Sequence, residues 1–250
     1  MRLAAALLAI ASMGCHEAPS SPDPAGSSAG ARVLFIGNSL TQYNGLSGMV
    51  RALARQAGEP LSVEEITFPG FSLEDHWNDG NARRVIGRGG WRYVVLQQGP
   101  SSLPESRDNL LLWAGRFNQE IRRAGARPAF YSVWPDITRS GFFDDVSESY
   151  RQAAAATDGL LLPAGEAWRA AWRRQPDFQL YGSDQFHPSV RGTYLAALVI
   201  CAQVLGRSPV GLATPLARQE GTMPAFTPTA AEAALLQEAA AEAIRDHGRP

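Results

Sequence analysis

The sequence predicts an α/β fold in which a parallel sheet is covered by helices on both faces. Short apolar stretches alternate with longer segments of helical periodicity, which is the pattern of strands joined by crossover helices. Most of the apolar stretches end at glycine or proline, where turns begin. The chain has 250 residues, of which 45% are hydrophobic and 19% charged. This length and composition suit one α/β domain, or at most two small ones.

Along the chain, the spacing of apolar residues changes between the period of strands and the period of helices. Strands are predicted at residues 32–37, 61–70, 91–99, 127–135 and 159–165. Helices are predicted at residues 45–58, 106–125, 146–157, 189–206 and 229–246. The carboxyl ends of parallel strands share one edge of the sheet, so residues that follow the strands are expected to meet there.

The N-terminal residues are expected to lie outside the fold. Residues 1–14 have a short basic start and an apolar run, which is typical of a secretory signal peptide. Small residues precede Cys15, a pattern that resembles the bacterial lipoprotein box, although Ser12 stands where leucine is usual. We expect a lipidated Cys15, a flexible tether over 15–31 and a folded domain over 32–250, outside the cytoplasm. The alternative is ordinary signal cleavage, with Cys15 incidental.

Charge and residue usage exclude several classes of function. The formal net charge of −1 favours neither nucleic acid nor acidic lipid as a partner, so membrane contact is expected only through the N-terminal lipid. All 23 basic residues are arginine, which excludes a lysine-based P-loop or Schiff-base enzyme. The four histidines have no metal-ligand spacing, so no metal site is expected. Cys201 lies in an apolar run and is predicted to be a buried thiol.

A hydroxyl, an imidazole and a carboxylate are predicted to meet at the edge of the sheet. Ser39 follows the first strand directly before a helix, where a helix N-terminus favours developing negative charge. Asp184 and His187 lie three residues apart before a later helix. A serine becomes a nucleophile when a base takes its proton, and a carboxylate orients that base. Each residue also has a structural interpretation, such as a helix N-cap for Ser39.

These motifs resemble the blocks of the SGNH (GDSL-like) hydrolase superfamily, in the right order over residues 32–206. "GNSL" resembles the first block, Gly70 in "FPGFSLEDHW" the glycine block, and "SDQFHP" the Asp-x-x-His block. The resemblance implies a three-layer α/β/α sandwich with a five-stranded, flavodoxin-like parallel sheet. It implies ester hydrolysis through an acyl-enzyme, without a cofactor. Ser39 would be the nucleophile, His187 the base and Asp184 its orienter, with an oxyanion hole of the Ser39 and Gly70 N–H groups.

The sequence departs from the family at the third block. The family has Gly-x-Asn-Asp there, whose asparagine donates to the oxyanion, whereas this chain has Gly99-Pro100-Ser101-Ser102. We predict that Gln98 or Gln97 replaces that donor, with Ser101 as the alternative. Successive strand residues point to opposite faces, so only one glutamine is expected to face the site. In the competing interpretation, the glutamines only brace the loop.

The substrate is expected to be a small-molecule or glycan ester. Carbohydrate O-acyl esters, acetyl esters among them, rank first by family analogy, ahead of lipid esters and thioesters. The rival hypothesis is a non-catalytic carbohydrate-binding protein on the same fold. His76, Trp134 and Phe186 are candidates for the pocket around the site, although a structural role for His76 and core packing for the two aromatic residues are the competing interpretations.

Overall fold

The sheet has five parallel strands in the order β2-β1-β3-β4-β5, as the resemblance implied. The computed structural model describes residues 30–212 and 225–248. The predicted signal peptide, Cys15 and the tether up to residue 29 lie outside these residues. The strands are β1 (Arg32–Gly37), β2 (Ser62–Thr67), β3 (Trp91–Leu96), β4 (Arg127–Tyr131) and β5 (Leu160–Leu162).

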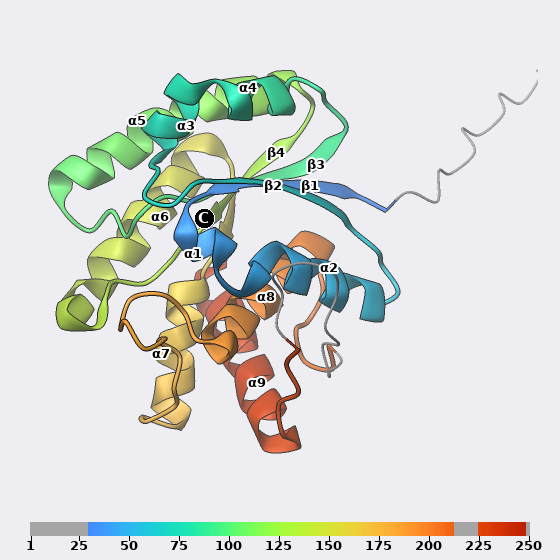
Figure 1. Cartoon of the computed structure of the whole chain (residues 1–250), viewed down its shortest axis with the longest axis vertical. Helices are drawn as coiled ribbons and strands as arrows, with labels where there is room; N and C mark the ends of the chain where they lie inside the picture. Colours follow the sequence, from blue (N-terminus) through green and yellow to red (C-terminus); the bar gives the residue numbers. More distant parts are fainter. Residues whose placement is uncertain (1–29, 213–224, 249–250) are drawn as a thin grey trace, which may run out of the picture.

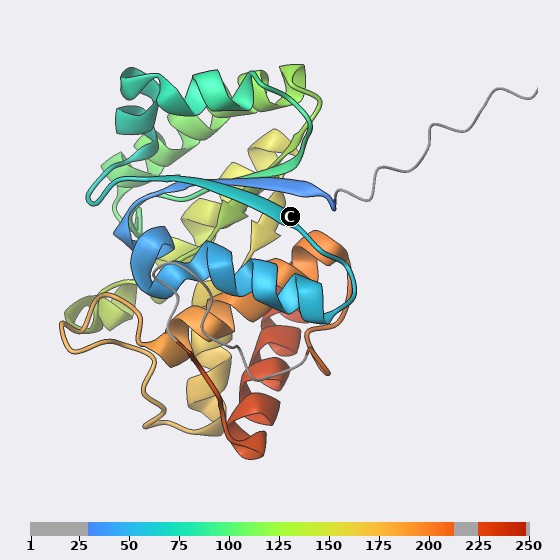
Figure 2. The ribbon, with the colours of Figure 1, turned by 45° about the vertical axis from the view of Figure 1, so that its right-hand side comes forward.

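Helices cover both faces of the sheet and give three layers (Figure 1). Figure 2 shows the same separation after a turn of the molecule, with the sheet between the two helical layers. One layer contains α3 (Leu73–Asp79), α4 (Asn81–Ile86), α5 (Pro104–Arg123) and α6 (Phe143–Thr157). The other contains α2 (Leu46–Gln56), α7 (Ala164–Arg174), α8 (Val190–Leu205) and α9 (Ala230–His247). Shorter turns are α1 (Ser39–Gln42), η1 (Tyr43–Gly45) and η2 (Ile137–Phe142).

Three helices, α3, α4 and α7, were not predicted from the sequence. α3 and α4 have seven and six residues, too few to repeat a helical pattern of apolar positions. α3 instead begins with a capping box, in which the Ser72 side chain accepts from the Asp75 N–H and the Asp75 carboxylate accepts from the Ser72 N–H. α7 is rich in alanine and arginine and has Trp168 and Trp172 four residues apart, so its sequence does carry a helical signal, although no helix was predicted there. None of the described helices is long and apolar enough to cross a bilayer.

The strand order reverses between β1 and β3, which places a ligand-binding edge at their carboxyl ends. β1 is covered on both faces, and its residues from Val33 to Ile36 are fully or almost fully buried. In the register between the strands, Ile36 pairs with Leu96, so the residues that follow both strands leave the sheet side by side. The Gln97 N–H donates to the Ile36 carbonyl at 2.9 Å and continues this pairing past the end of β3.

Cys201 is buried in α8, and burial raises the pKa of its thiol to about 12. In a chain whose Cys15 is replaced by serine, we expect native protein at pH 8 to react with a thiol reagent at least 100-fold more slowly than unfolded protein, because only the thiolate is nucleophilic. Absorbance of the released chromophore measures both rates. Equal rates with and without denaturant would contradict this burial.

Candidate active site

Ser39 is the first residue of α1, immediately after the turn that ends β1. Asn38 caps this short helix: its backbone is extended, and its Oδ1 accepts from the Leu40 N–H at 3.1 Å. The cap leaves the Ser39 N–H outside the helical hydrogen bonds. Within residues 30–212 and 225–248, no acceptor contacts the N–H of Ser39 or that of Gly70. These two donors are therefore available to a ligand.

His187 and Asp184 are close to the Ser39 hydroxyl and connected to it by hydrogen bonds. The His187 Nε2 lies 2.9 Å from Ser39 Oγ, and its Nδ1 lies 2.5 Å from Asp184 Oδ2. Asp184 Oδ1 also accepts from the backbone N–H groups of Phe186 and His187, at 3.1 and 2.9 Å. The hydrogen bond to the His187 side chain, joined by these backbone bonds, lowers the pKa of Asp184. An ionised Asp184 holds Nδ1 protonated and leaves Nε2 to accept from Ser39.

The residues just after α1 contact the histidine loop directly. The Tyr43 ring stacks on the His187 imidazole, with centroids 4.3 Å apart and planes 16° from parallel. The next residue, Asn44, donates from Nδ2 to the Pro188 carbonyl at 3.0 Å and to Thr193 Oγ1 at 2.9 Å. Asn44 has a φ of 53°, in the left-handed region that asparagine tolerates better than most residues. Tyr43 and Asn44 therefore connect the serine segment to the histidine loop.

A cavity of about 590 Å³ opens beside Ser39 and is called the Ser39 pocket below. Its wall includes Ser39, Gly70, Gln98, Ser101 and Phe186. Gly70 has a φ of 78°, which a residue with a Cβ rarely adopts, and this conformation belongs to the turn after β2. Ser39 and Gly70, whose N–H groups are free, thus lie in the same pocket wall.

The structure argues against Gln97 as an oxyanion donor, because its amide is buried and hydrogen-bonded on both sides. Its Oε1 accepts from the Asn38 N–H at 2.9 Å and from Thr41 Oγ1 at 2.7 Å. Its Nε2 donates to Asn38 Oδ1 at 2.9 Å and to the Gln98 carbonyl. Gln97 is not among the residues that line the pocket. The first of the two glutamines therefore braces the turn that carries Ser39.

Gln98 and Ser101 line the pocket but are hydrogen-bonded to each other. Gln98 Nε2 donates to Ser101 Oγ at 2.9 Å, and Ser101 Oγ donates to the Gly99 carbonyl at 3.1 Å. Gln98 Oε1 accepts from the Leu73 N–H at 3.1 Å. An amide nitrogen carries two hydrogens, so Gln98 retains one donor beyond its bond to Ser101. Of the three predicted donors, Gln98 keeps a free hydrogen in the pocket wall.

Two of the three predicted pocket residues do not line the Ser39 pocket. Trp134 is fully buried against Trp168, with ring centroids 3.6 Å apart, so it belongs to the core. His76 is also fully buried, and burial lowers its pKa, so its neutral ring donates from Nε2 to the Gly37 carbonyl at 2.8 Å. Phe186, for which pocket and core were both considered, lies in the pocket wall. His76 therefore supports the turn before Ser39 through its hydrogen bond to the Gly37 carbonyl.

No role at the site was predicted from the sequence for Asn38, Tyr43 or Asn44. Asn38 lies inside the "GNSL" motif, and its position before a helix is a signal for an N-cap. Tyr43 and Asn44 carried no signal, because their partners lie more than 140 residues away in the chain. Among the described residues, no group of three or more His, Cys, Asp or Glu side chains is arranged to hold a metal ion.

Comparison with known proteins identifies the fold. No protein-family model and no curated protein matches the sequence. A candidate SGNH hydrolase from Slackia heliotrinireducens is 26% identical, with a TM-score of 0.58 over 70% of this chain and 98% of its own. A DUF4886 family protein from Bacteroides uniformis is 18% identical, with a TM-score of 0.71 over 86% of this chain and 95% of its own. An acetyl-xylooligosaccharide esterase from Geobacillus is 16% identical, with a TM-score of 0.56 over 70% of this chain and 94% of its own.

We expect Gln97→Ala to lower the free energy of unfolding by about 2–4 kcal/mol, because the buried Asn38 N–H and Thr41 hydroxyl lose their acceptor, at ~1–3 kcal/mol for each unpaired group. Urea unfolding measures the change. Gln175→Ala, which removes an exposed amide, serves as the control and should change stability by less than about 0.5 kcal/mol. A Gln97→Ala protein that is as stable as the wild type would show that this network does not support the turn.

Proposed function

We propose that this chain, whose fold is that of the SGNH hydrolases, is a serine esterase that acts through an acyl-enzyme. The observation that carries the proposal is the row of hydrogen bonds from Ser39 Oγ through the His187 ring to Asp184. Its Ser39 end lies in the wall of a pocket that Gly70 also lines, and the N–H groups of both residues are free. A nucleophile, a base, an orienting carboxylate and oxyanion donors are the parts that acyl transfer requires.

The proposed reaction uses each of these groups in two half-reactions. Ser39 Oγ attacks the ester carbonyl carbon while His187 Nε2 takes the hydroxyl proton, and the oxyanion accepts from the Ser39 and Gly70 N–H groups. When the tetrahedral intermediate collapses, the alcohol leaves with the proton from His187, and Ser39 carries the acyl group. His187 then deprotonates a water molecule that attacks the acyl carbon. Breakdown releases the carboxylic acid and returns the proton to Ser39.

Carbohydrate O-acyl esters, including acetyl esters, are the substrate class that we propose. The pocket wall contains several hydroxyl and amide side chains, and they suit a ligand that carries hydroxyl groups. These polar side chains are Ser72, Gln98, Ser101, Ser102, Ser106 and Asn109. One of the structural neighbours is an acetyl-xylooligosaccharide esterase. Lipid esters and thioesters are the second choice, which the apolar residues Phe71, Leu103 and Phe186 in the same wall favour.

We also propose that the protein acts outside the cytoplasm, held at a membrane by a lipid on Cys15. The basis is the sequence alone: an apolar leader, small residues before Cys15 and a polar segment before the domain. One acyl chain binds a membrane weakly, so a modification with several chains is required for a stable anchor. A tether would give the enzyme access to polymeric glycans.

We expect a fluorophosphonate to label Ser39 in the wild type and to leave Ser39→Ala unlabelled, because only an activated serine reacts. Turnover of a nitrophenyl ester should fall by about 10⁴-fold or more in Ser39→Ala and in His187→Ala. Peptide mass spectrometry locates the label, and Ser47→Ala, which removes an exposed hydroxyl bound to Glu65, is the control. Undiminished esterase activity in purified Ser39→Ala would refute the assigned nucleophile. An unlabelled wild type that binds glycans would instead support a non-catalytic binding protein.

Mass spectrometry of protein expressed with its leader in a bacterial host should show a mature chain that starts at a lipidated Cys15. Cys15→Ser should abolish the lipid and release the protein from the membrane fraction, whereas Cys201→Ser should not, because Cys201 is buried in the fold. An unlipidated N-terminus at another residue would establish ordinary secretion instead.

A further inference from the structure

We infer that the Ser39 pocket binds a negatively charged group of the substrate, a carboxylate carried by the ester, through Arg139. This inference rests on the proposed esterase function and specifies its substrate class. Among the described residues that line the pocket, Arg139 is the one charged residue, and no aspartate or glutamate lies in the wall. The wall is therefore positively charged at a single residue, in the same pocket as the proposed nucleophile.

Arg139 has no carboxylate partner within the described part of the chain. It lies in η2 at a kink in the backbone, and its guanidinium lies over the Phe142 ring, 4.9 Å from the ring centroid. The nearest acidic residue in sequence, Asp136, caps the same segment by accepting from the Thr138 N–H at 3.0 Å. By contrast, Arg173 and Arg174 both contact Glu242 of α9. The aromatic contact holds the Arg139 guanidinium while leaving its N–H donors unpaired.

Ser102 supplies a second, independent sign of a ligand. It is 93% buried, since only 7% of its surface is exposed, and it lies in the pocket wall. Its hydroxyl has no hydrogen-bond partner among the residues that the structure describes, and its oxygen is not one of the fully enclosed unpaired atoms, so it is open to the Ser39 pocket. Ser102 immediately precedes Leu103, the N-cap of the 20-residue helix α5, where the helix dipole adds positive potential. An anion in the pocket would satisfy this hydroxyl.

A carboxylate matches these groups better than a neutral ester does. A guanidinium binds a carboxylate through two parallel N–H···O bonds, and a hydroxyl can donate a further bond to the same group. The pocket volume of about 590 Å³ holds a sugar-sized group together with the scissile ester. The substrates expected are acyl esters of uronic-acid glycans, in which the alcohol carries the carboxylate, or half-esters of dicarboxylic acids, in which the acyl group carries it.

Two matched pairs of substrates test the inference and distinguish its two forms. O-acetylated methyl glucuronoside and O-acetylated methyl glucoside differ only in a carboxylate on the alcohol. 4-Nitrophenyl hydrogen adipate and 4-nitrophenyl hexanoate differ in a carboxylate on the acyl chain. For each pair, the quantity measured is the ratio of kcat/KM for the anionic ester to that for the neutral ester. Wild type, Arg139→Gln, Arg139→Lys and Arg116→Gln are compared at low and high salt.

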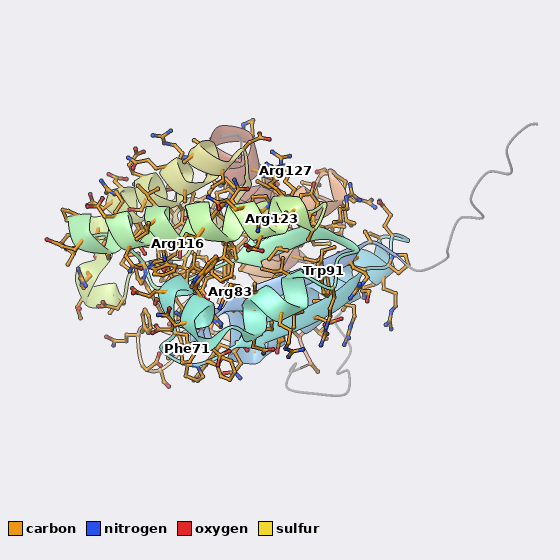
Figure 3. All side chains as sticks on the ribbon, turned by 90° about the horizontal axis from the view of Figure 1, so that it is seen from above. Phe71, Arg83, Trp91, Arg116, Arg123 and Arg127 are labelled. Carbon is orange, nitrogen blue, oxygen red and sulfur yellow. The ribbon has the colours of Figure 1, made fainter. Side chains whose placement is uncertain are left out.

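Arg116, which is labelled in Figure 3, is a close control because it is also an exposed arginine over an aromatic ring, 4.3 Å from the Trp113 centroid. It is not one of the residues that line the pocket. We expect Arg139→Gln to lower the ratio about fivefold for one pair, the scale of a partly exposed charge interaction. Arg139→Lys should retain part of the preference, Arg116→Gln should retain all of it, and salt should weaken it. Ratios that are equal in wild type, Arg139→Gln and Arg116→Gln for both pairs would overturn the inference.

A binding measurement separates failure of this inference from failure of the proposed function. Calorimetry would follow methyl glucuronoside and adipate binding to Ser39→Ala, with and without Arg139→Gln. Binding of either anion that weakens about fivefold with Arg139→Gln supports the inference, even if no ester is turned over and the esterase proposal fails. Binding of neither anion, or binding that Arg139→Gln leaves unchanged, overturns it, even if the esters are hydrolysed.

Discussion

The hydrogen bonds of the Gln97 side chain set the geometry on which the candidate site depends. Gln97 follows β3, and its amide contacts both the backbone and the side chain of Asn38, which follows the neighbouring strand β1. A Cβ on Gly37 would lie 2.4 Å from Gln97 Oε1, so glycine is required at the end of β1 for the amide to reach this turn. Because Asn38 then caps α1, the orientation of Ser39 follows from this one buried amide.

A second set of contacts joins the segment that starts at Ser39 to the loop that carries Asp184 and His187, which lies far away in the chain. Tyr43 and Asn44 continue the segment that starts at Ser39, and they contact His187, Pro188 and Thr193 on the approach to α8. The packing of α2 against α8 on the same face keeps the two segments together. Contacts of both segments thus keep Ser39 Oγ close to His187 Nε2. The short helix α1 therefore does not have to be stable by itself.

Burial divides the polar groups around the site into two sets with different roles. Gln97 and Thr41 are buried and paired, and His76 is buried with its Nε2 paired, so these residues maintain the turn before Ser39 and are closed to ligands. Figure 3 shows Phe71, which follows β2, at one end of the helical layer and Trp91, the first residue of β3, toward the other. The groups left without protein partners lie in the pocket at the carboxyl ends of these strands. They include the Ser39 and Gly70 N–H groups, the Ser102 hydroxyl and the Arg139 guanidinium.

The sequence by itself determined the alternation of strands and helices, and the order of the motifs around Ser39, Gly70, Asp184 and His187, because these signals are local in the chain. It could not assign Gln97 and Gln98, since alternation along a strand shows that they point to opposite faces but not which face is buried. It left open whether Trp134 and His76 line the pocket or have a structural role, because an aromatic residue near a motif has the same local sequence in either place. Only the tertiary structure decided these cases. Gln97 contacts a residue 59 positions away, and Asn44 one 149 positions away, and such contacts exist only after the sheet and its helices have assembled.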